Sequence, residues 1–134
     1  MEKREAILKE YIPDVLYDRF PNEWSGGTKR FTGVPLEKLE ELQTKQLIDL
    51  EERQNNSPTV AEFMDIMKRF PKLSAHGYIV TEERPDARTS IEGLEGFVAY
   101  GEMSDVEKLL AHADEWNIKP DTNRGGYQVR SWWD

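Results

Sequence analysis

The clearest structural signal in this chain comes from residues 75–92, which read AHGYIVTEERPDARTSIE. Residues 75–81 are rich in β-branched and aromatic side chains, which favour extended strands. Residues 83–87 have turn-forming chemistry, with a proline followed by an aspartate, and residues 88–92 return to a strand-like composition. The pattern predicts a β-hairpin.

After this hairpin the chain predicts one helix and two more strands. Residues 93–101 contain three glycines and are compatible with a loop, a bulge, a short strand or a turn of helix. Ser104 and Glu107 have the spacing of a capping box, which predicts a helix that begins at Ser104. Strand-like runs at residues 115–119 and 127–133 are joined by residues with turn chemistry.

Before the hairpin the pattern is helical. Apolar side chains recur at helical spacing from Val60 to Phe70, and Pro71 ends the run. The preceding pair of Ser57 and Pro58 predicts the start of this helix, with serine as the N-cap and proline in the first turn. Leu, Glu, Lys and Gln dominate residues 36–53, which predicts a long surface helix.

The first part of the chain predicts helix followed by loop. Apolar pairs spaced by four residues run through the first sixteen residues, but Pro13 interrupts them, which predicts two short helices or one kinked helix. Residues 21–35 contain three glycines and two prolines without any period, which predicts a loop.

These elements predict an α+β fold in which N-terminal helices are followed by a β-β-α-β-β arrangement. The short links between strands require antiparallel pairing, so we expect an antiparallel sheet of about four strands. The helix of residues 60–70 and the helix from Ser104 are expected to cover one face. At 134 residues the chain is expected to be a single domain, mainly helical in residues 1–70, with the sheet and one helix in residues 71–134.

Composition narrows the function classes. The net charge of −8 repels phosphate backbones and disfavours nucleic acid as a partner, while it favours basic partners. The chain has no cysteine, which excludes disulfides and thiolate metal sites. No apolar run has the length of a signal peptide or a membrane span. We therefore expect a soluble cytoplasmic protein without a cofactor.

One cluster on the predicted hairpin has residue types that could support catalysis. His76 and Tyr78 would share a sheet face with Arg88 and Glu92, which gives general acid, general base and anion-stabilising groups for a small hydrolase or lyase. An ordinary solvated sheet face with cross-strand ion pairs explains the same pattern. No metal-ligand spacing is present, and we predict no metal site.

The chain closes with aromatic residues. Trp132 and Trp133 are consecutive on the last predicted strand, so they should point to opposite faces, and Arg130 shares a face with Trp132. Tryptophan and arginine are enriched where proteins bind each other. The alternative is that helices cover both sides of this strand. A fourth candidate, Trp24, would anchor a basic loop.

The sequence favours a non-enzymatic function. The chain has few residues in a catalytic pattern, but it has many aromatic residues and a strong negative charge. We therefore expect a small acidic protein that binds a protein partner or forms a homo-oligomer through Trp24, Arg130, Trp132 and Trp133. The hydrolase or lyase is the alternative.

Overall fold

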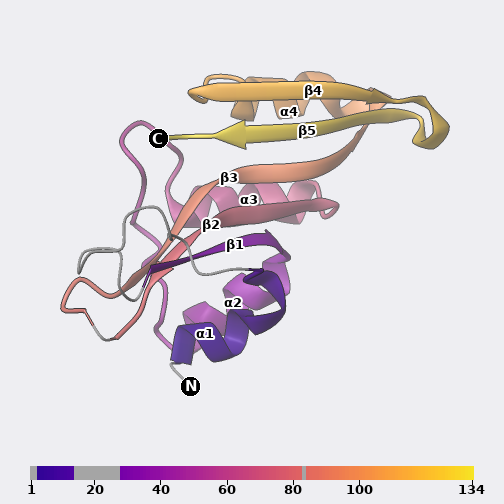
Figure 1. Ribbon diagram of the computed structural model, residues 1–134. Helices are drawn as coiled ribbons and strands as arrows, with labels where there is room; N and C mark the ends of the chain where they lie inside the picture. The colour runs from indigo at the N-terminus through magenta and orange to yellow at the C-terminus, as the bar shows by residue number, and fades with distance from the viewer. Residues whose placement is uncertain (1–2, 14–27, 83) are drawn as a thin grey trace.

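The computed structural model describes residues 3–13, 28–82 and 84–134. These residues form an α+β fold with one open antiparallel sheet of five strands in the order β1-β2-β3-β5-β4 (Figure 1). The strands are β1 (Thr28–Val34), β2 (Leu73–Val80), β3 (Arg88–Ala99), β4 (Glu115–Asp121) and β5 (Gly126–Trp132). The α-helices are α1 (Lys3–Leu8), α2 (Leu36–Thr44), α3 (Val60–Arg69) and α4 (Met103–Leu110). Short 3-10 helices are η1 (Lys9–Tyr11), η3 (Tyr100–Glu102) and η4 (Thr122–Arg124).

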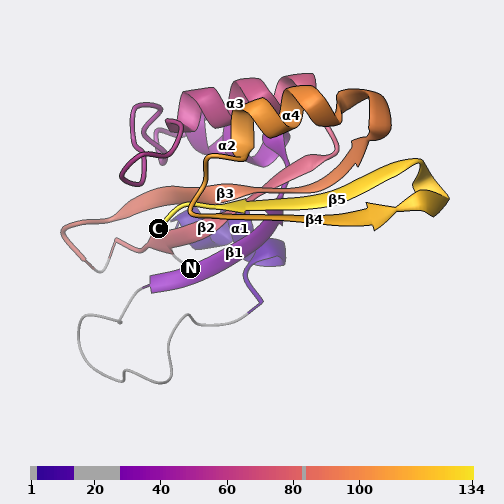
Figure 2. The ribbon, with the colours of Figure 1, turned by 90° about the horizontal axis from the view of Figure 1, so that it is seen from above.

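The helices α3 and α4 cover one face of the sheet (Figure 2). The opposite face of the sheet is turned toward the viewer in Figure 1. The helices α1 and α2 lie near β1. The fully buried core side chains include Leu39, Phe63, Met67, Ile79, Leu94, Val98, Val106 and Leu110. The two helical segments predicted to cover the sheet therefore do so. In the described part of the chain, no helix has the length and apolar character needed to cross a bilayer.

The predicted hairpin is confirmed. β2 and β3 pair antiparallel from Val80 opposite Arg88 to Leu73 opposite Gly96, and the register shifts between His76 and Gly77. β3 does not stop at residue 92 but continues to Ala99, so residues 93–99, for which loop and strand were both open, are strand. They pair with β2 on one side and with β5 on the other. Two neighbours thus hold a glycine-rich segment in an extended conformation that its own composition does not favour.

The predicted loop at residues 21–35 is wrong for residues 28–34, which form β1, while residues 21–27 lie outside the described residues. β1 pairs with β2 and is irregular between Phe31 and Val34, where Gly33 has a φ of 72°. Only a few of its side chains are buried, so it shows no clear alternation. Pairing with β2 outweighs weak local propensity, and the sheet has five strands rather than about four.

The long helix predicted at residues 36–53 ends at Thr44. The reason is a Schellman-type end, in which the N–H of Leu47 donates to the carbonyl of Leu42 (2.8 Å) and Gln46 takes a left-handed φ of 59°. This end buries Leu47 and Ile48 in the core. Glycine is the usual residue at that position, so the sequence carried no stop signal.

Both predicted helix starts are displaced. The N-cap of α3 is Thr59, whose side chain accepts the N–H of Glu62 while the Glu62 carboxylate accepts the N–H of Thr59. Ser57 instead closes a turn, because its Oγ accepts the N–H of Gln54. The predicted cap at Ser104 is also wrong, because α4 begins at Met103 and the Ser104 side chain makes no cap.

The closing strands are confirmed, but β4 is two residues longer than predicted, and β5 begins and ends one residue earlier than predicted. β4 and β5 pair in register from Glu115 opposite Trp132 to Asp121 opposite Gly126. Trp133 is 2% exposed and packs edge-on against Phe63 of α3, with the ring centroids 5.5 Å apart. Trp132 is half-buried. The two consecutive tryptophans therefore lie on opposite faces, as their alternation predicts.

Candidate functional site

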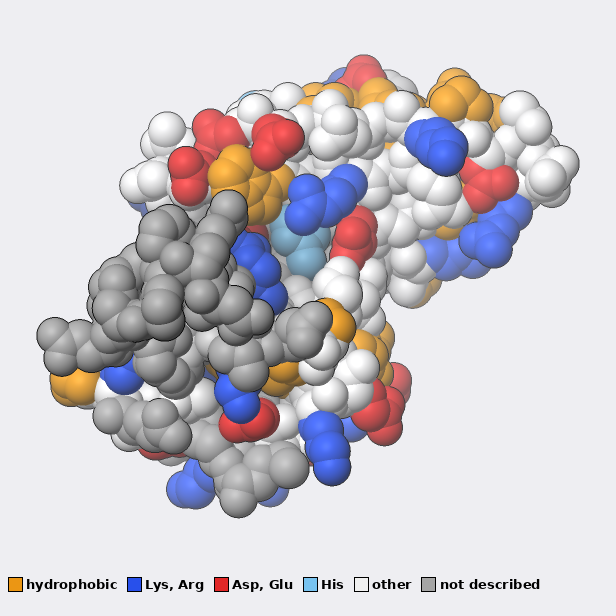
Figure 3. Space-filling view, in the orientation of Figure 1, with side chains coloured by type: hydrophobic (Ala, Val, Ile, Leu, Met, Phe, Trp, Pro, Cys, Tyr) orange, Lys and Arg blue, Asp and Glu red, His pale blue; other side chains and the backbone are white. Residues whose placement is uncertain are grey.

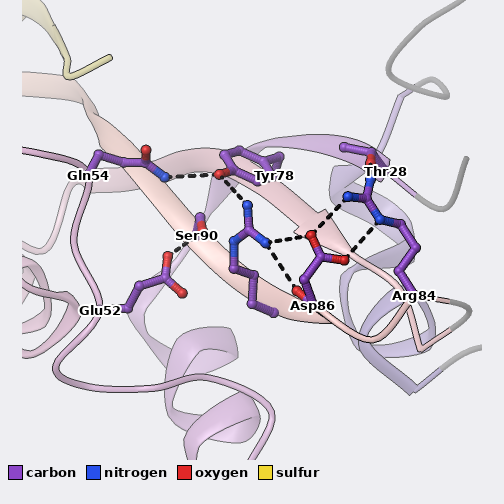
Figure 4. Close-up of polar contacts among 8 residues, drawn as sticks. Thr28, Glu52, Gln54, Tyr78, Arg84, Asp86 and Ser90 are labelled. Atoms are coloured by element: carbon purple, nitrogen blue, oxygen red, sulfur yellow. Dashed lines mark hydrogen bonds and ion pairs between the residues drawn. The ribbon is translucent and has the colours of Figure 1, made fainter. Parts of the chain in front are cut away.

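Tyr78 is the centre of a polar network at the end of the sheet where β2 and β3 meet their connecting turn (Figure 4). Its hydroxyl oxygen accepts hydrogen bonds from Gln54 Nε2 and from Arg88 Nη2, each at 3.2 Å. The guanidinium of Arg88 also lies 5.5 Å from the centre of the Tyr78 ring. The structure thus brings together two of the four predicted catalytic residues, Tyr78 and Arg88.

The same network reaches the turn and β1 through Asp86. Both oxygens of Asp86 accept hydrogen bonds from Arg84, from Nε at 2.9 Å and from Nη2 at 2.8 Å. Arg88 Nη1 donates to Asp86 Oδ2 at 3.1 Å. Arg84 also donates to Thr28 Oγ1 at 3.2 Å. Asp86 therefore joins two guanidinium groups and fixes the turn that carries it.

The environment of the network changes the acidity of two groups. Burial raises the pKa of Tyr78, but the hydrogen bonds from Arg88 and Gln54 outweigh burial, and the net pKa is below its usual value. Burial raises the pKa of Glu52, which accepts a hydrogen bond from the hydroxyl of Ser90. Arg88 and Glu52 border an open cleft of about 420 Å³. The cleft can admit a small polar molecule.

His76 lies apart from this network. Its Nε2 is 2.7 Å from the backbone oxygen of Ser131, and the residue is 3% exposed. Because a carbonyl oxygen can only accept, Nε2 carries the proton. Burial lowers the pKa of His76 from 6.5 to about 4, while the hydrogen bond to Ser131 acts in the opposite direction and Arg130 adds to the lowering. At neutral pH this imidazole is uncharged.

Glu92, the fourth predicted catalytic residue, pairs with Arg30 of β1. Arg30 lies opposite Tyr78 in the register of β1 and β2. The described side chains show no hydrogen bond from His76 to Tyr78, Arg88 or Glu92. The predicted cluster is therefore divided into the Tyr78 and Arg88 pair, the Glu92 and Arg30 pair, and the buried His76.

No group of three or more His, Asp or Glu side chains in residues 3–13, 28–82 and 84–134 is arranged to hold a metal ion.

A second cleft opens beside Trp132. It has a volume of about 630 Å³ and is lined by Asn55, Asn56, Asp114, Glu115, Trp132 and Asp134, and it is called here the Trp132 cleft. In Figure 3, red acidic side chains lie above and to the left of an orange hydrophobic side chain at the end of the molecule where the C-terminus lies. Within the described part of the chain, the three carboxylates of this cleft form no ion pair with a basic side chain.

Hydrogen bonds fix the walls of the Trp132 cleft. The N–H of Asp134 donates to Asp114 Oδ2 at 2.8 Å, and Asn55 Nδ2 donates to the backbone oxygen of Asp134 at 2.6 Å. The N–H of Trp133 donates to the carbonyl of Glu92 at 2.7 Å. The last two residues are therefore held by hydrogen bonds to Asn55, Glu92 and Asp114.

The other predicted binding residues are in different environments. Arg130 is exposed, and its Nε lies 3.7 Å from Glu95 Oε2. The indole of Trp133 belongs to the core, so direct contact with a partner would require it to leave the core. Trp24 lies outside the described residues. Sequence reasoning missed the three acidic residues of the cleft, although the pairing of the last two strands would have placed Glu115 opposite Trp132.

Comparison of the chain with protein-family models, with curated proteins and with solved structures found no match.

Proposed function

We propose that this chain is a non-catalytic binding protein whose ligand is a basic segment of a partner protein. The observation that carries the proposal is the Trp132 cleft, in which Asp114, Glu115 and Asp134 border one indole ring. A lysine or arginine side chain that enters this cleft meets negative charge and an aromatic face together. Tryptophan is the side chain that attracts cations most strongly through its ring face.

The charge of the whole chain supports the same class of ligand. A net charge of −8 attracts basic segments from a distance and increases their rate of encounter. Each exposed carboxylate contributes little by itself, on the order of 0–1 kcal/mol. The affinity therefore depends on several carboxylates and the indole acting together, and it should fall as salt is added.

The rigidity of the cleft supports binding without rearrangement. Asp114 is held by the N–H of Asp134, and the backbone of Asp134 is held by Asn55. The neighbouring Trp133 anchors the end of the strand in the core. A site whose groups are already ordered loses less conformational entropy when its ligand binds.

The test uses a fluorescently labelled oligoarginine peptide at low salt, with binding followed by anisotropy. Trp132→Ala should raise the Kd about fivefold, because the cation–π contact is lost. Asp114→Asn removes one charge while its side-chain oxygen can still accept the N–H of Asp134, and it should raise the Kd about two- to fivefold.

The matched control is Asp65→Asn, which removes the same charge from an exposed position on α3. It should leave the Kd within about twofold of wild type, since it acts only through the long-range field. The proposal fails if the wild-type chain does not bind the peptide at low salt, or if the control weakens binding as much as Asp114→Asn.

The second candidate function is a small hydrolase or lyase centred on the Tyr78 network. The specific observation in its favour is a phenol of lowered pKa that contacts Arg88, next to a cleft that Arg88 and Glu52 border. An activated phenol beside a cation can serve as a general base or a nucleophile. Turnover of a panel of activated esters that disappears in Tyr78→Phe, with the fold retained, would support this function. Equal turnover in both chains would remove it.

A further inference from the structure

The two edge strands of the sheet, β1 and β4, differ in the contacts that they make. At the β1 edge, Lys29 forms an ion pair with Glu5 of α1, and η1 contacts the strand. β4 is the other edge and has β5 as its only neighbouring strand within the described residues. Figure 1 shows β4 at the outer border of the sheet, with α4 behind it. An edge strand presents unpaired N–H and C=O groups, and another chain can pair with them.

β4 is suited to such pairing by its exposure and regularity. The exposed residues of β4 are Glu115, Asn117, Ile118, Lys119 and Pro120. Its pairing with β5 has no register shift, so the strand carries no bulge that would turn its free edge away. Ile118 is 40% exposed and is one of two large hydrophobic side chains at the surface among the described residues, the other being Tyr100.

We infer that β4 pairs antiparallel with β4 of a second copy of this chain, with Asn117 on the twofold axis. In this register Glu115 lies opposite the partner's Lys119, and by symmetry Lys119 lies opposite the partner's Glu115. Trp116 lies opposite the partner's Ile118 in the same way. Opposite charges and apolar pairs that face each other directly are the pairs that stabilise antiparallel strands. The order Glu-Trp-Asn-Ile-Lys is thus complementary to itself when reversed.

Neighbouring registers lack this complementarity. With Ile118 on the axis, Glu115 lies opposite the partner's Asp121, and Trp116 lies opposite the partner's Pro120, which has no N–H to donate. With Trp116 on the axis, Ile118 lies opposite the partner's Asp114. In the Asn117 register, Pro120 falls outside the paired segment. Proline therefore limits the pairing to residues 115–119 and helps to select the register.

The short pairing sets the expected strength. Five residues of edge bury much less than the roughly 1,200 Å² of a stable interface, so the dimer is weak and depends on concentration. Two copies of charge −8 also repel each other over a distance. Near-physiological ionic strength screens that repulsion beyond about 8 Å while directly opposed side chains still interact. The register shares Glu115 with the Trp132 cleft, whereas Trp132, Asp114 and Asp134 take no part in it.

The experiment measures the dimer dissociation constant of the full chain by sedimentation velocity over a range of concentrations. Lys119→Glu places like charges opposite each other at both ends of the register and should raise the Kd about tenfold. The double variant with Glu115→Lys and Lys119→Glu exchanges the charges and should restore a Kd close to that of wild type. Lys68→Glu on α3 makes the same charge change at an exposed position outside the register and is the matched control.

A second readout locates the interface. The amides of residues 115–119 that face the free edge should exchange more slowly as concentration rises, because pairing protects them. Far-ultraviolet circular dichroism checks that each variant is folded. The inference is overturned by a wild-type chain that stays monomeric up to about millimolar concentration. It is equally overturned by a dimer that is insensitive to Lys119→Glu, or by a double variant that fails to re-associate. Peptide binding at the Trp132 cleft is tested with Trp132→Ala and Asp114→Asn, which lie outside the register, so the failure of one proposal can be told from the failure of the other.

Discussion

The imidazole of His76 on β2 reaches across one strand to the backbone oxygen of Ser131 on β5, and its Nε2 lies 2.7 Å from that oxygen. The strand between them is β3, and Gly93 lies opposite His76 in the register. A Cβ at Gly93 would lie 1.9 Å from the Ser131 oxygen and 2.7 Å from His76 Nε2. The hydrogen bond therefore depends on the absence of a side chain at residue 93.

Gly93→Ala should destabilise the fold. The added methyl group overlaps backbone on β5 and the His76 ring, and overpacking of this kind costs about 1–3 kcal/mol or more. Urea unfolding followed by tryptophan fluorescence measures the loss. Gly101→Ala is the control, because a Cβ there meets no atom within 4 Å and Gly101 has no positive φ. An unchanged unfolding midpoint in Gly93→Ala would contradict the described packing.

The stability of the fold should fall between about pH 6.5 and pH 4 in a way that depends on His76. Its pKa is 6.5 in the unfolded chain and about 4 in the fold. Between these two pH values the imidazole is protonated in the unfolded chain and neutral in the fold. The contribution of the neutral His76 to the free energy of unfolding is complete above pH 6.5. It is lost as pH falls, by about 2–3 kcal/mol at pH 4. His76→Gln can still donate to Ser131 but does not titrate. Its urea unfolding should therefore show a shallower dependence on pH, and equal slopes for the two chains would contradict the assignment.

Tyr78 should ionise at a lower pH than an ordinary tyrosine. Arg88 and Gln54 both donate to its oxygen and stabilise the phenolate, and these bonds outweigh the effect of burial. Because the folded pKa is lowered, ionisation of Tyr78 adds stability as pH rises through that pKa toward 10. A titration of phenolate absorbance should contain an early transition that Tyr78→Phe removes and Tyr100→Phe retains. The same transition in all three chains would contradict the hydrogen-bonding arrangement.

Thr59 and Ser104 should differ as helix caps. Thr59→Ala removes the side-chain oxygen that accepts the N–H of Glu62 and should cost about 1 kcal/mol. Ser104→Ala should change the free energy of unfolding by no more than a few tenths of a kcal/mol, because Ser104 lies inside α4 and makes no cap. Thermal unfolding of the two variants provides the comparison. A larger loss for Ser104→Ala would restore the start predicted from the sequence.

Much of the fold could be predicted where local pattern and tertiary environment agree. The apolar stripe from Val60 to Phe70 and the hairpin of β2 and β3 have strong periods and clear stop signals, and both are present. β1 could not be predicted in this way, because its extended conformation comes from pairing with β2 rather than from its own residues. The end of α2 was hidden because Gln46 occupies a position where glycine is the usual signal.

The candidate site was predictable only in part. Alternation along a strand can be read from neighbouring residues, but the contacts that a side chain makes depend on segments far away in the sequence. Alternation correctly separates Trp132 from Trp133, and it places His76 and Tyr78 on one face. It does not reveal that His76 crosses Gly93 to reach Ser131 and so lies apart from Tyr78 and Arg88. The wall of the Trp132 cleft combines the amide of Asn55 with the carboxylates of Asp114 and Asp134, which are far apart in the chain. Such a convergence depends on tertiary structure that no single window of sequence contains.

The carbonyl of Leu47 accepts hydrogen bonds from Arg4 Nε at 3.2 Å and from Thr89 Oγ1 at 2.8 Å. One oxygen atom thereby ties α1, the segment after α2 and β3 to one another. A fragment designed to begin at β1 would lose Arg4 and free one side of this three-way junction. The N-terminal helix should therefore be retained in any shortened version made for crystallography or nuclear magnetic resonance.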